Sequence, residues 1–223
     1  MSLFERLKAA AADDWNGYVD HAFVRGLGDG TLPQAAFRRY LVQDYLFLIQ
    51  FARAHALAAY KARSLADMRI ANAGLAAIVD VEMQLHLRLC ERWGLSAADV
   101  EAGAEHPATV AYTRWVLDIG MAGDLLELQV ALTPCTLGYA EIGRRLAPRG
   151  VDAIDAAHPY REWIGEYAGD AFQQLGRDTQ AWLDDLGRRH GGDQRFDALL
   201  AIFAKAARLE ADFWQMGLDA GGA

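Results

Sequence analysis

The chain contains little cysteine, little proline and no long apolar run, and each shortage excludes a class of protein. Two cysteines, Cys90 and Cys135, among 223 residues are too few for a disulfide framework. No segment reaches the roughly 18 consecutive apolar residues of a membrane span, and no apolar signal-peptide segment follows the charged N-terminus. We therefore expect a protein of the reducing cytoplasm.

Basic residues are also scarce. Lys and Arg together number 22 against 30 Asp and Glu, so the formal net charge is −8. A nucleic-acid-binding surface needs clustered Lys and Arg, and an anionic membrane surface attracts the same clusters. Because the sequence contains no such cluster, we expect neither nucleic acid nor a membrane as a partner.

The spacing of the apolar residues predicts an all-α protein. Apolar residues recur every three or four positions and almost nowhere at every second position, and only five prolines interrupt the chain. The expected helices cover about 3–18, 33–55, 67–93, 107–116, 125–146, 159–167, 171–189 and 203–217. No linker or shift in composition divides them, so we expect a single helical domain over residues 1–223.

Local signals mark where several of these helices begin and end. Ser2 is an expected N-cap of the first helix. The run Gly26–Gly30 is expected to form a turn, and Gly120 and Gly123 are expected to end the helix that begins near residue 107. Pro134 falls inside an expected helix and should kink it.

Three of the expected helices carry one reactive side chain each inside an otherwise apolar stripe. Asp44 lies in the second helix, Cys135 directly follows Pro134, and Glu210 lies in the last helix. An unpaired carboxylate in an apolar interior is strongly unfavourable, so Asp44 and Glu210 need partners or a cavity. The aromatic residues near them in the helical pattern are Tyr40, Phe47, Tyr112 and Tyr139. Two carboxylates and a thiol between aromatic walls would suit a flat, polar, heteroaromatic ligand.

Simpler interpretations of the same residues stay open. A lone cysteine in a core stripe is far more often a small apolar residue than a nucleophile, and we interpret Cys90 in this way. A single buried carboxylate more often pairs with Arg or Tyr than acts as a catalyst. Aromatic stripes usually belong to the core.

A second pattern pairs Glu82 with His86 one helical turn later, and His55 stands on another expected helix. Di-iron carboxylate proteins repeat a Glu-x-x-His pattern on two helices. Here the spacing is Glu-x-x-x-His and it occurs once, so we expect Glu82 and His86 to support the shape of a pocket and expect no metal. A metal-dependent oxidase on the same helical scaffold remains the alternative.

The chain resembles the TenA (thiaminase II) family over nearly its whole length. The similar segments are HAFVRGLGDGTLPQAAFRRYLVQDYLFL at 21–48, EMQLH at 82–86, LTPCTLGYAEIG at 132–143, HPYREWIGEYAGDAF at 158–172 and EADFWQMG at 210–217. The resemblance implies a haem-oxygenase-like all-α fold. It also implies hydrolysis of aminopyrimidines derived from thiamin, which supplies hydroxymethylpyrimidine for thiamin salvage, without a cofactor.

The resemblance further implies roles for individual residues. Cys135 matches the family's nucleophile and places the chain in the cysteine-containing branch. Asp44 matches the aspartate that holds the pyrimidine, and Glu210 matches the glutamate that transfers protons. The aromatic residues that match the family's substrate pocket are Phe47, where some members have Tyr, and Tyr112, Tyr139 and Tyr167.

The activity implied is an aminopyrimidine aminohydrolase that acts on 4-amino-5-aminomethyl-2-methylpyrimidine and on thiamin through covalent catalysis by Cys135. A non-catalytic binder of thiamin or pyrimidine is a further alternative, although a binder needs neither Cys135 nor Glu210. The family is typically a homotetramer, and we expect the same here. The bulky run from Trp214 to Leu218 is the expected contribution to that interface.

Overall fold

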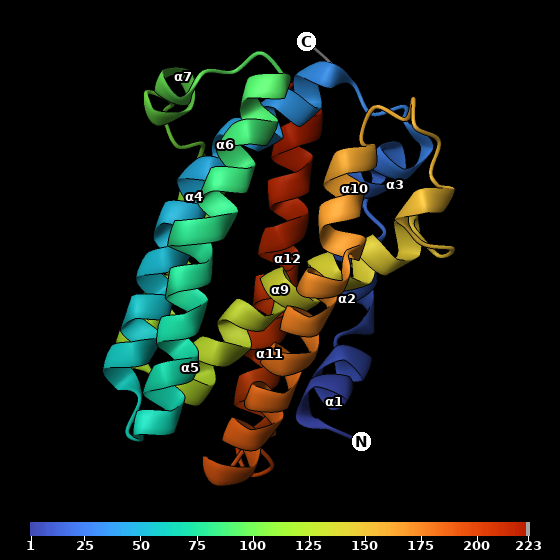
Figure 1. Ribbon diagram of the computed structural model, residues 1–223. Helices are drawn as coiled ribbons and strands as arrows, with labels where there is room; N and C mark the ends of the chain where they lie inside the picture. The colour runs from blue at the N-terminus through green and yellow to red at the C-terminus, as the bar shows by residue number, and fades with distance from the viewer. Residues whose placement is uncertain (222–223) are drawn as a thin grey trace. The chain divides into compact units, whose positions relative to one another are not determined.

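A computed structural model describes residues 1–221 of the chain, and within them it contains helices and no strand (Figure 1). The helices are α1 (Leu3–Ala10), α2 (Ala12–Val19), α3 (Ala22–Asp29), α4 (Gln34–Lys61), α5 (Leu65–Ala76), the π-helix η1 (Ala77–Glu82), α6 (Met83–Arg92), α7 (Ala97–Glu101), α8 (Pro107–Ala122), α9 (Leu125–Leu146), the 3-10 helix η2 (Val151–Ala153), α10 (Arg161–Ala168), α11 (Asp170–Arg189) and α12 (Phe196–Asp219). The all-α prediction is confirmed. No helix of this part of the chain is long and apolar enough to cross a membrane.

The helices fall into two compact units. The first unit contains Met1–Pro33 and Gln129–Trp214, and the second unit contains Gln34–Leu128 together with the described residues after Trp214. Two of the boundaries fall inside α9 and α12, and the third, between Pro33 and Gln34, lies at the start of α4. The single domain expected from the sequence stays a prediction.

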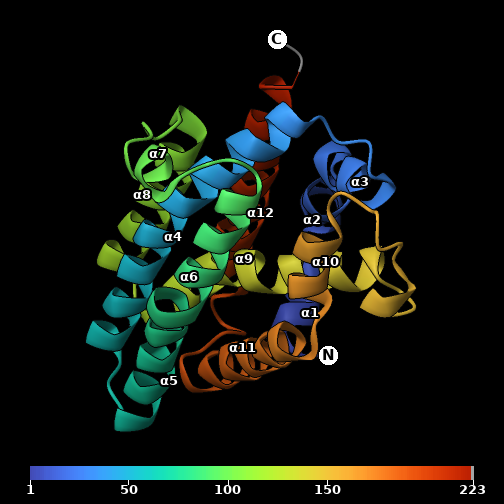
Figure 2. The ribbon, with the colours of Figure 1, turned by 45° about the horizontal axis from the view of Figure 1, so that its top comes forward.

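The second unit is built around α4. Helices α5, α6, α7 and α8 all pack against α4, and Figures 1 and 2 both show α5 and α6 running alongside it. The helix starts directly after Pro33, a residue that favours the first turn because its missing N–H needs no partner there. Its buried face carries Phe37, Tyr40, Leu41 and Asp44, so a carboxylate lies inside an apolar surface.

The first unit has an aromatic core that joins its N-terminal and C-terminal helices. Trp15 of α2 stacks on Phe203 of α12 with ring centroids 5.5 Å apart. Phe23 of α3 stacks on Trp214 of α12 at 4.9 Å. Large rings bury the most apolar area per side chain, so these contacts anchor the short helices α2 and α3 to α12.

A buried carboxylate joins α1 and α2 to α9. Glu141 accepts hydrogen bonds from Lys8 Nζ at 2.5 Å and from Trp15 Nε1 at 3.1 Å, and Arg145 forms an ion pair with the same carboxylate. Burial acts to raise the pKa of Glu141. The two cations and the indole N–H outweigh burial, so the pKa lies below its usual 4.5.

Several expected helix ends are wrong, and close packing explains two of them. The expected turn at Gly26–Gly30 is mostly helix α3, and Gly30 alone takes the left-handed conformation, with φ of 72°. A Cβ at Gly28 would lie 2.7 Å from Leu146, and a Cβ at Gly120 would lie 2.7 Å from Leu57. These two glycines therefore permit close helix packing and do not end helices. Gly120 lies inside α8, and that helix ends at Gly123 as expected.

Two of the expected long helices are interrupted. Ser2 caps α1, as the sequence predicts, but α1 ends at Ala10 and α2 begins at Ala12. The helix expected over 67–93 contains the π-helix η1 between α5 and α6. Ile70 and Leu85, which a regular 3.6-residue period would place on the core stripe, are 45% and 36% exposed. The expectation that both residues face the core is wrong, and for Leu85, which follows η1, the π turn changes the helical period.

Candidate functional site

Asp44 is a buried carboxylate on α4 with partners on two helices. Its side chain is 7% exposed, and the Tyr40 hydroxyl donates to its Oδ2 across 3.1 Å. His86 Nδ1 of α6 lies 3.4 Å from the same oxygen. Burial raises the pKa of Asp44, while the charge of His86 and the hydrogen bond from Tyr40 act in the opposite direction.

His86 is held in a fixed orientation by a backbone group. Its Nε2 lies 2.7 Å from the carbonyl oxygen of Leu41, and the side chain is 6% exposed. A carbonyl oxygen only accepts hydrogen bonds, so Nε2 carries a proton and Nδ1 is the nitrogen that faces Asp44. The sequence pairs His86 with Glu82, and the structure places His86 against Asp44.

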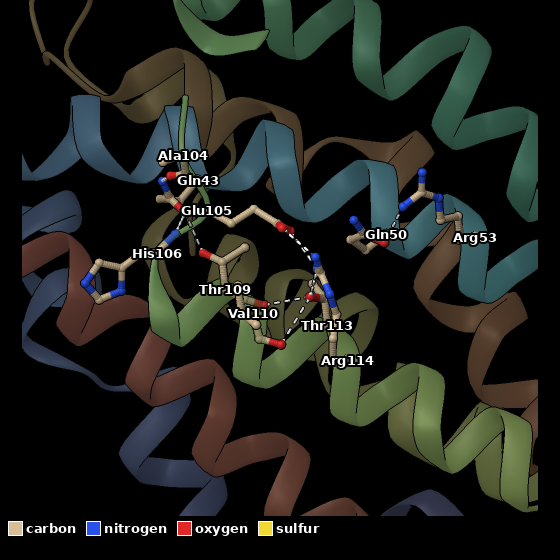
Figure 3. Close-up of polar contacts among 10 residues, drawn as sticks. All are labelled: Gln43, Gln50, Arg53, Ala104, Glu105, His106, Thr109, Val110, Thr113 and Arg114. Carbon is tan, nitrogen blue, oxygen red and sulfur yellow. Dashed lines mark hydrogen bonds and ion pairs between the residues drawn. The ribbon is translucent and has the colours of Figure 1, made fainter. Parts of the chain in front are cut away.

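Gln43, the residue before Asp44, fixes the start of α8 against α4 (Figure 3). Its Nε2 donates to the Ala104 carbonyl at 2.9 Å, and its Oε1 accepts from the His106 amide at 2.8 Å and from the Thr109 hydroxyl at 2.7 Å. Gln43 is 1% exposed, so all three bonds lie in a dry environment where a broken bond is costly. The Glu105–Arg114 ion pair, also drawn in Figure 3, closes the same loop onto α8.

This attachment of α8 places an aromatic pair beside Asp44. Tyr112 of α8 contacts Phe47 of α4, with ring centroids 5.2 Å apart, and Phe47 stacks on Phe51 at 5.5 Å. Phe47 and Tyr112 are both buried. Phe47 follows Asp44 by almost one helical turn, so the second unit joins a hydrogen-bonded carboxylate to two aromatic rings.

Cys135 lies on α9 in the first unit. It is half-buried, whereas Cys90 is buried. Pro134 precedes Cys135 and lacks an N–H, so the Val130 carbonyl one turn earlier loses its usual bond within the helix. Tyr139 follows Cys135 by one helical turn and is buried.

Tyr139 belongs to a ring cluster from three helices. Its ring centroid lies 4.8 Å from that of Tyr167 of α10 and 5.3 Å from that of Trp214 of α12, and Trp163 lies 4.6 Å from Tyr167. Glu210 of α12 is 2% exposed and precedes Trp214 by one turn. The first unit therefore presents a thiol, a buried carboxylate and a cluster of aromatic rings.

Two residues bring α10 close enough to α9 for the Tyr139–Tyr167 contact. A Cβ at Gly143 would lie 2.4 Å from the Tyr167 carbonyl carbon, so only glycine fits there without movement of the backbone. Gln173 Nε2 donates to the carbonyls of Ala140 and Tyr167 at 2.9 Å and 2.6 Å. Helical spacing does not reveal Gln43 or Gln173, because each acts on the backbone of another element. For Gln43 the available signal is a polar pair, Gln-Asp, inside an apolar helix.

Glu82 and His55, which the sequence offers as possible metal ligands, do not form a metal site among the described residues. Glu82 ends η1 and is half-buried. His55 packs on the edge of Phe51 and against Gly74, its buried Nδ1 has no hydrogen-bond partner, and burial lowers its pKa to about 4. Among residues 1–221, no group of three or more His, Cys, Asp and Glu side chains could hold a metal ion.

Comparisons with known proteins identify the family that this chain matches and relatives with similar sequences. Residues 8–220 match the TENA/THI-4/PQQC family. An aminopyrimidine aminohydrolase of Halalkalibacterium halodurans is 37% identical over 220 residues, which cover 98% of this chain and 96% of the relative. An aminopyrimidine aminohydrolase of Bacillus subtilis is 31% identical over 97% of this chain and 89% of the relative.

Solved structures agree with the helical architecture. A protein of Silicibacter sp. TM1040, described as a TenA family transcription regulator, has a TM-score of 0.91 and 43% identity, covering 97% of this chain and 96% of its own. A domain of Shewanella denitrificans with a haem-oxygenase-like fold has a TM-score of 0.74 at 14% identity, covering 97% of this chain and 92% of its own. The expected haem-oxygenase-like fold is thereby confirmed.

Proposed function

Because the chain belongs to the TENA/THI-4/PQQC family, we propose that it is an aminopyrimidine aminohydrolase of thiamin salvage. The proposed reaction converts 4-amino-5-aminomethyl-2-methylpyrimidine, or thiamin, to 4-amino-5-hydroxymethyl-2-methylpyrimidine. The single observation that carries the proposal is the setting of Asp44, a buried carboxylate between Tyr40 and His86 and beside the Phe47–Tyr112 ring pair. A carboxyl group next to aromatic rings is suited to the amidine-like edge of an aminopyrimidine.

The proposed chemistry begins with covalent catalysis by Cys135. Its thiolate adds to C6 of the pyrimidine, which removes the aromaticity of the ring and forms an enamine. The enamine expels the leaving group from the methylene on C5, and water adds to the exocyclic methylene that results. The C6–S bond then breaks, the thiolate leaves, and the aromatic ring is restored. Covalent catalysis thus divides one difficult displacement into easier steps.

The carboxylates and aromatic residues have separate roles in this proposal. Asp44 binds the ring nitrogen and the 4-amino group. Glu210 gives a proton to the departing amine and takes one from the attacking water. Tyr112 and Tyr167 orient the ring and the thiol by hydrogen bonds, and Phe47 and Tyr139 stack on the ring.

Turnover of aminomethyl-aminopyrimidine and of thiamin, measured side by side, tests the proposal. We expect wild-type protein to turn over the aminopyrimidine, and Cys135→Ser to lose turnover while it still binds the hydroxymethyl product, because a neutral hydroxyl is a poor nucleophile toward C6. Wild-type-like turnover by Cys135→Ser would exclude covalent catalysis at this residue. Binding without turnover by the wild type would favour a non-catalytic binder.

A chelation experiment separates the proposed hydrolase from a metal-dependent oxidase. The mechanism uses no Lewis acid, so exhaustive chelation should leave turnover unchanged. Activity that is lost on chelation and restored by iron or manganese would instead favour the oxidase and assign Glu82 and His86 as ligands.

A further inference from the structure

The buried face of α8 changes in character along the helix. The buried residues of its first half are Thr109, Tyr112 and Thr113, and those of its second half are Val116 and Gly120. Gly120 permits a close approach to α4, so the second half is placed by tight apolar packing. Apolar contacts have no direction, whereas hydrogen bonds fix a distance and an angle. The first half, which buries two hydroxyl groups and one ring, therefore depends on hydrogen bonds for its position.

Gln43 of α4 supplies hydrogen bonds of this kind. Its Oε1 accepts from the amide of His106, the N-cap of α8, at 2.8 Å and from the hydroxyl of Thr109 at 2.7 Å. Its Nε2 donates to the Ala104 carbonyl at 2.9 Å. A backbone N–H only donates and a carbonyl oxygen only accepts, so a reversed side-chain amide would oppose like groups at both contacts. Gln43 is 1% exposed, so water does not replace a bond that is lost.

Other polar contacts of this region are internal to α8 or lie nearer the solvent. Thr113 Oγ1 donates to the Thr109 carbonyl at 2.7 Å, and this bond stays within α8. Glu105 pairs with Arg114 and contacts Gln50 of α4, but the side chains of Glu105 and Arg114 are 24% and 45% exposed. Exposed ion pairs contribute little. Gln43 is therefore a dry and directional link between α4 and the first half of α8 (Figure 3).

This polar link lies one turn from the aromatic pair. Phe47 follows Gln43 by four residues on α4, and Tyr112 follows Thr109 by three residues on α8, so each pair shares a helix face. Gln43 bonds to Thr109, and one turn further along both helices Phe47 contacts Tyr112, with ring centroids 5.2 Å apart. The hydrogen bond at the first level therefore sets the spacing of the rings at the second level.

We propose that Gln43 is a positioning residue for the aromatic wall of the pyrimidine site, and that it acts through Tyr112. This inference rests on the proposed function. A flat ligand contacts both rings of the wall only while the placement of Tyr112 relative to Phe47 is held. Contact energy falls steeply when a gap of an ångström opens between two surfaces. Loss of the Gln43 bonds should therefore weaken the binding of an aminopyrimidine.

A double-mutant cycle tests this proposal, with the dissociation constant of 4-amino-5-hydroxymethyl-2-methylpyrimidine measured by calorimetry. Gln43→Met keeps the length of the side chain and removes its three hydrogen bonds. We expect Gln43→Met alone to weaken binding about tenfold. In a Tyr112→Leu background the ring is already absent, so the same substitution should change the affinity by less than about twofold.

Thr113→Val is the matched control, because it removes a buried hydroxyl whose bond to a carbonyl stays within α8. Gln43→Met and Thr113→Val should both lower the melting temperature, but only Gln43→Met should weaken pyrimidine binding. If Gln43→Met fails to fold, Thr109→Val takes its place in the cycle. It removes one of the bonds to Oε1, and we expect a loss of about threefold that again disappears without the Tyr112 ring.

Equal losses of affinity with and without the Tyr112 ring would overturn the inference, and so would an unchanged affinity in Gln43→Met. Either result would leave Gln43 a residue that serves stability alone. Failure of the wild type to bind any aminopyrimidine is a different result. It would overturn the proposed function, and this inference with it.

Discussion

At the scale of single residues, the two cysteines differ in how far their thiols are buried. Cys90 is buried, and burial followed by the nearby charge of Asp44 raises the pKa of its thiol to about 12. Such a thiol stays protonated at neutral pH and packs as a small apolar side chain. Cys135 is half-buried, so it is the more accessible thiol. Sequence spacing places both cysteines in apolar surroundings and cannot measure this difference.

Glu210 gives a prediction that separates two proton-transfer roles. We expect Glu210→Gln to lower kcat on the aminomethyl substrate by about a hundredfold to ten-thousandfold, the usual range for loss of a general acid. Thiamin should be affected less, because its thiazolium departs as a neutral thiazole without a proton. Steady-state kinetics on both substrates measure this, with Asp212→Asn on the exposed side of α12 as control. Equal losses would assign Glu210 to ring positioning or to water activation.

At the scale of secondary-structure elements, local signals predict where many helices begin, and packing decides how they continue. Ser2, the expected N-cap of the first helix, caps α1, and the structure adds a capping box with Glu5. Pro107 likewise marks the first turn of α8. No comparable local signal predicts the π-helix η1. Its wider turn changes which side chains of α6, relative to those of α5, face α4. The sequence therefore predicts the helices that carry Asp44, Cys135 and Glu210, but it does not predict that His86 lies against Asp44.

The π turn itself can be tested by changing the chain length. Deletion of Val79, which is 48% exposed in η1, should convert η1 to regular α-helix while α5 and α6 keep the same faces toward α4, since one residue corresponds to about 100°. We expect a melting temperature equal to or above that of the wild type, and unchanged pyrimidine affinity. Insertion of one alanine after Val79 adds a further 100° and should lower both. Equal destabilisation by deletion and insertion would contradict this account.

The carboxylate of Glu141 predicts a pH dependence for the attachment of α1 and α2 to α9. Its pKa lies below the usual 4.5, so its stabilising contribution is present above about that pH and is lost as the pH falls through the lowered value. Glu141→Gln keeps an acceptor for Trp15 but removes the charge paired with Lys8. We expect a loss on the order of 1–3 kcal/mol in the free energy of unfolding at pH 7, measured by urea denaturation.

That loss should shrink toward zero in acid, where the wild-type carboxyl is also protonated. Asp185→Asn, which removes exposed ion pairs with Arg188 and Arg189, is the matched control and should change stability by about 0–1 kcal/mol. A Glu141→Gln penalty that stays constant down to the acid limit would show that side-chain shape is responsible and charge is not.

At the scale of the whole molecule, the structure does not contain the exposed apolar segment that the sequence predicts for residues 214–218. Trp214 and Met216 are 0% and 4% exposed, so the run Trp214–Leu218 is largely interior and the expectation of an exposed apolar segment there is wrong. The bulk of that run serves the core, where Trp214 contacts Tyr139. Apolar side chains are exposed instead along α5, η1 and α6, namely Leu65, Met68, Ile70, Val79, Val81 and Leu85.

We propose that copies of this chain form a homotetramer, and the exposed apolar residues of α5, η1 and α6 are the surface expected to contribute, because such clusters mark protein interfaces. Light scattering at micromolar concentration should give the mass of four chains. Val81 is 55% exposed, and Val81→Asp places a charge that an apolar interface would have to bury unpaired, so we expect it to reduce the mass. Leu175→Asp, at a 38% exposed position of α11, is the control and should leave the mass unchanged. A monomeric wild type would contradict the tetramer, whereas a tetrameric Val81→Asp would place the interface on another surface.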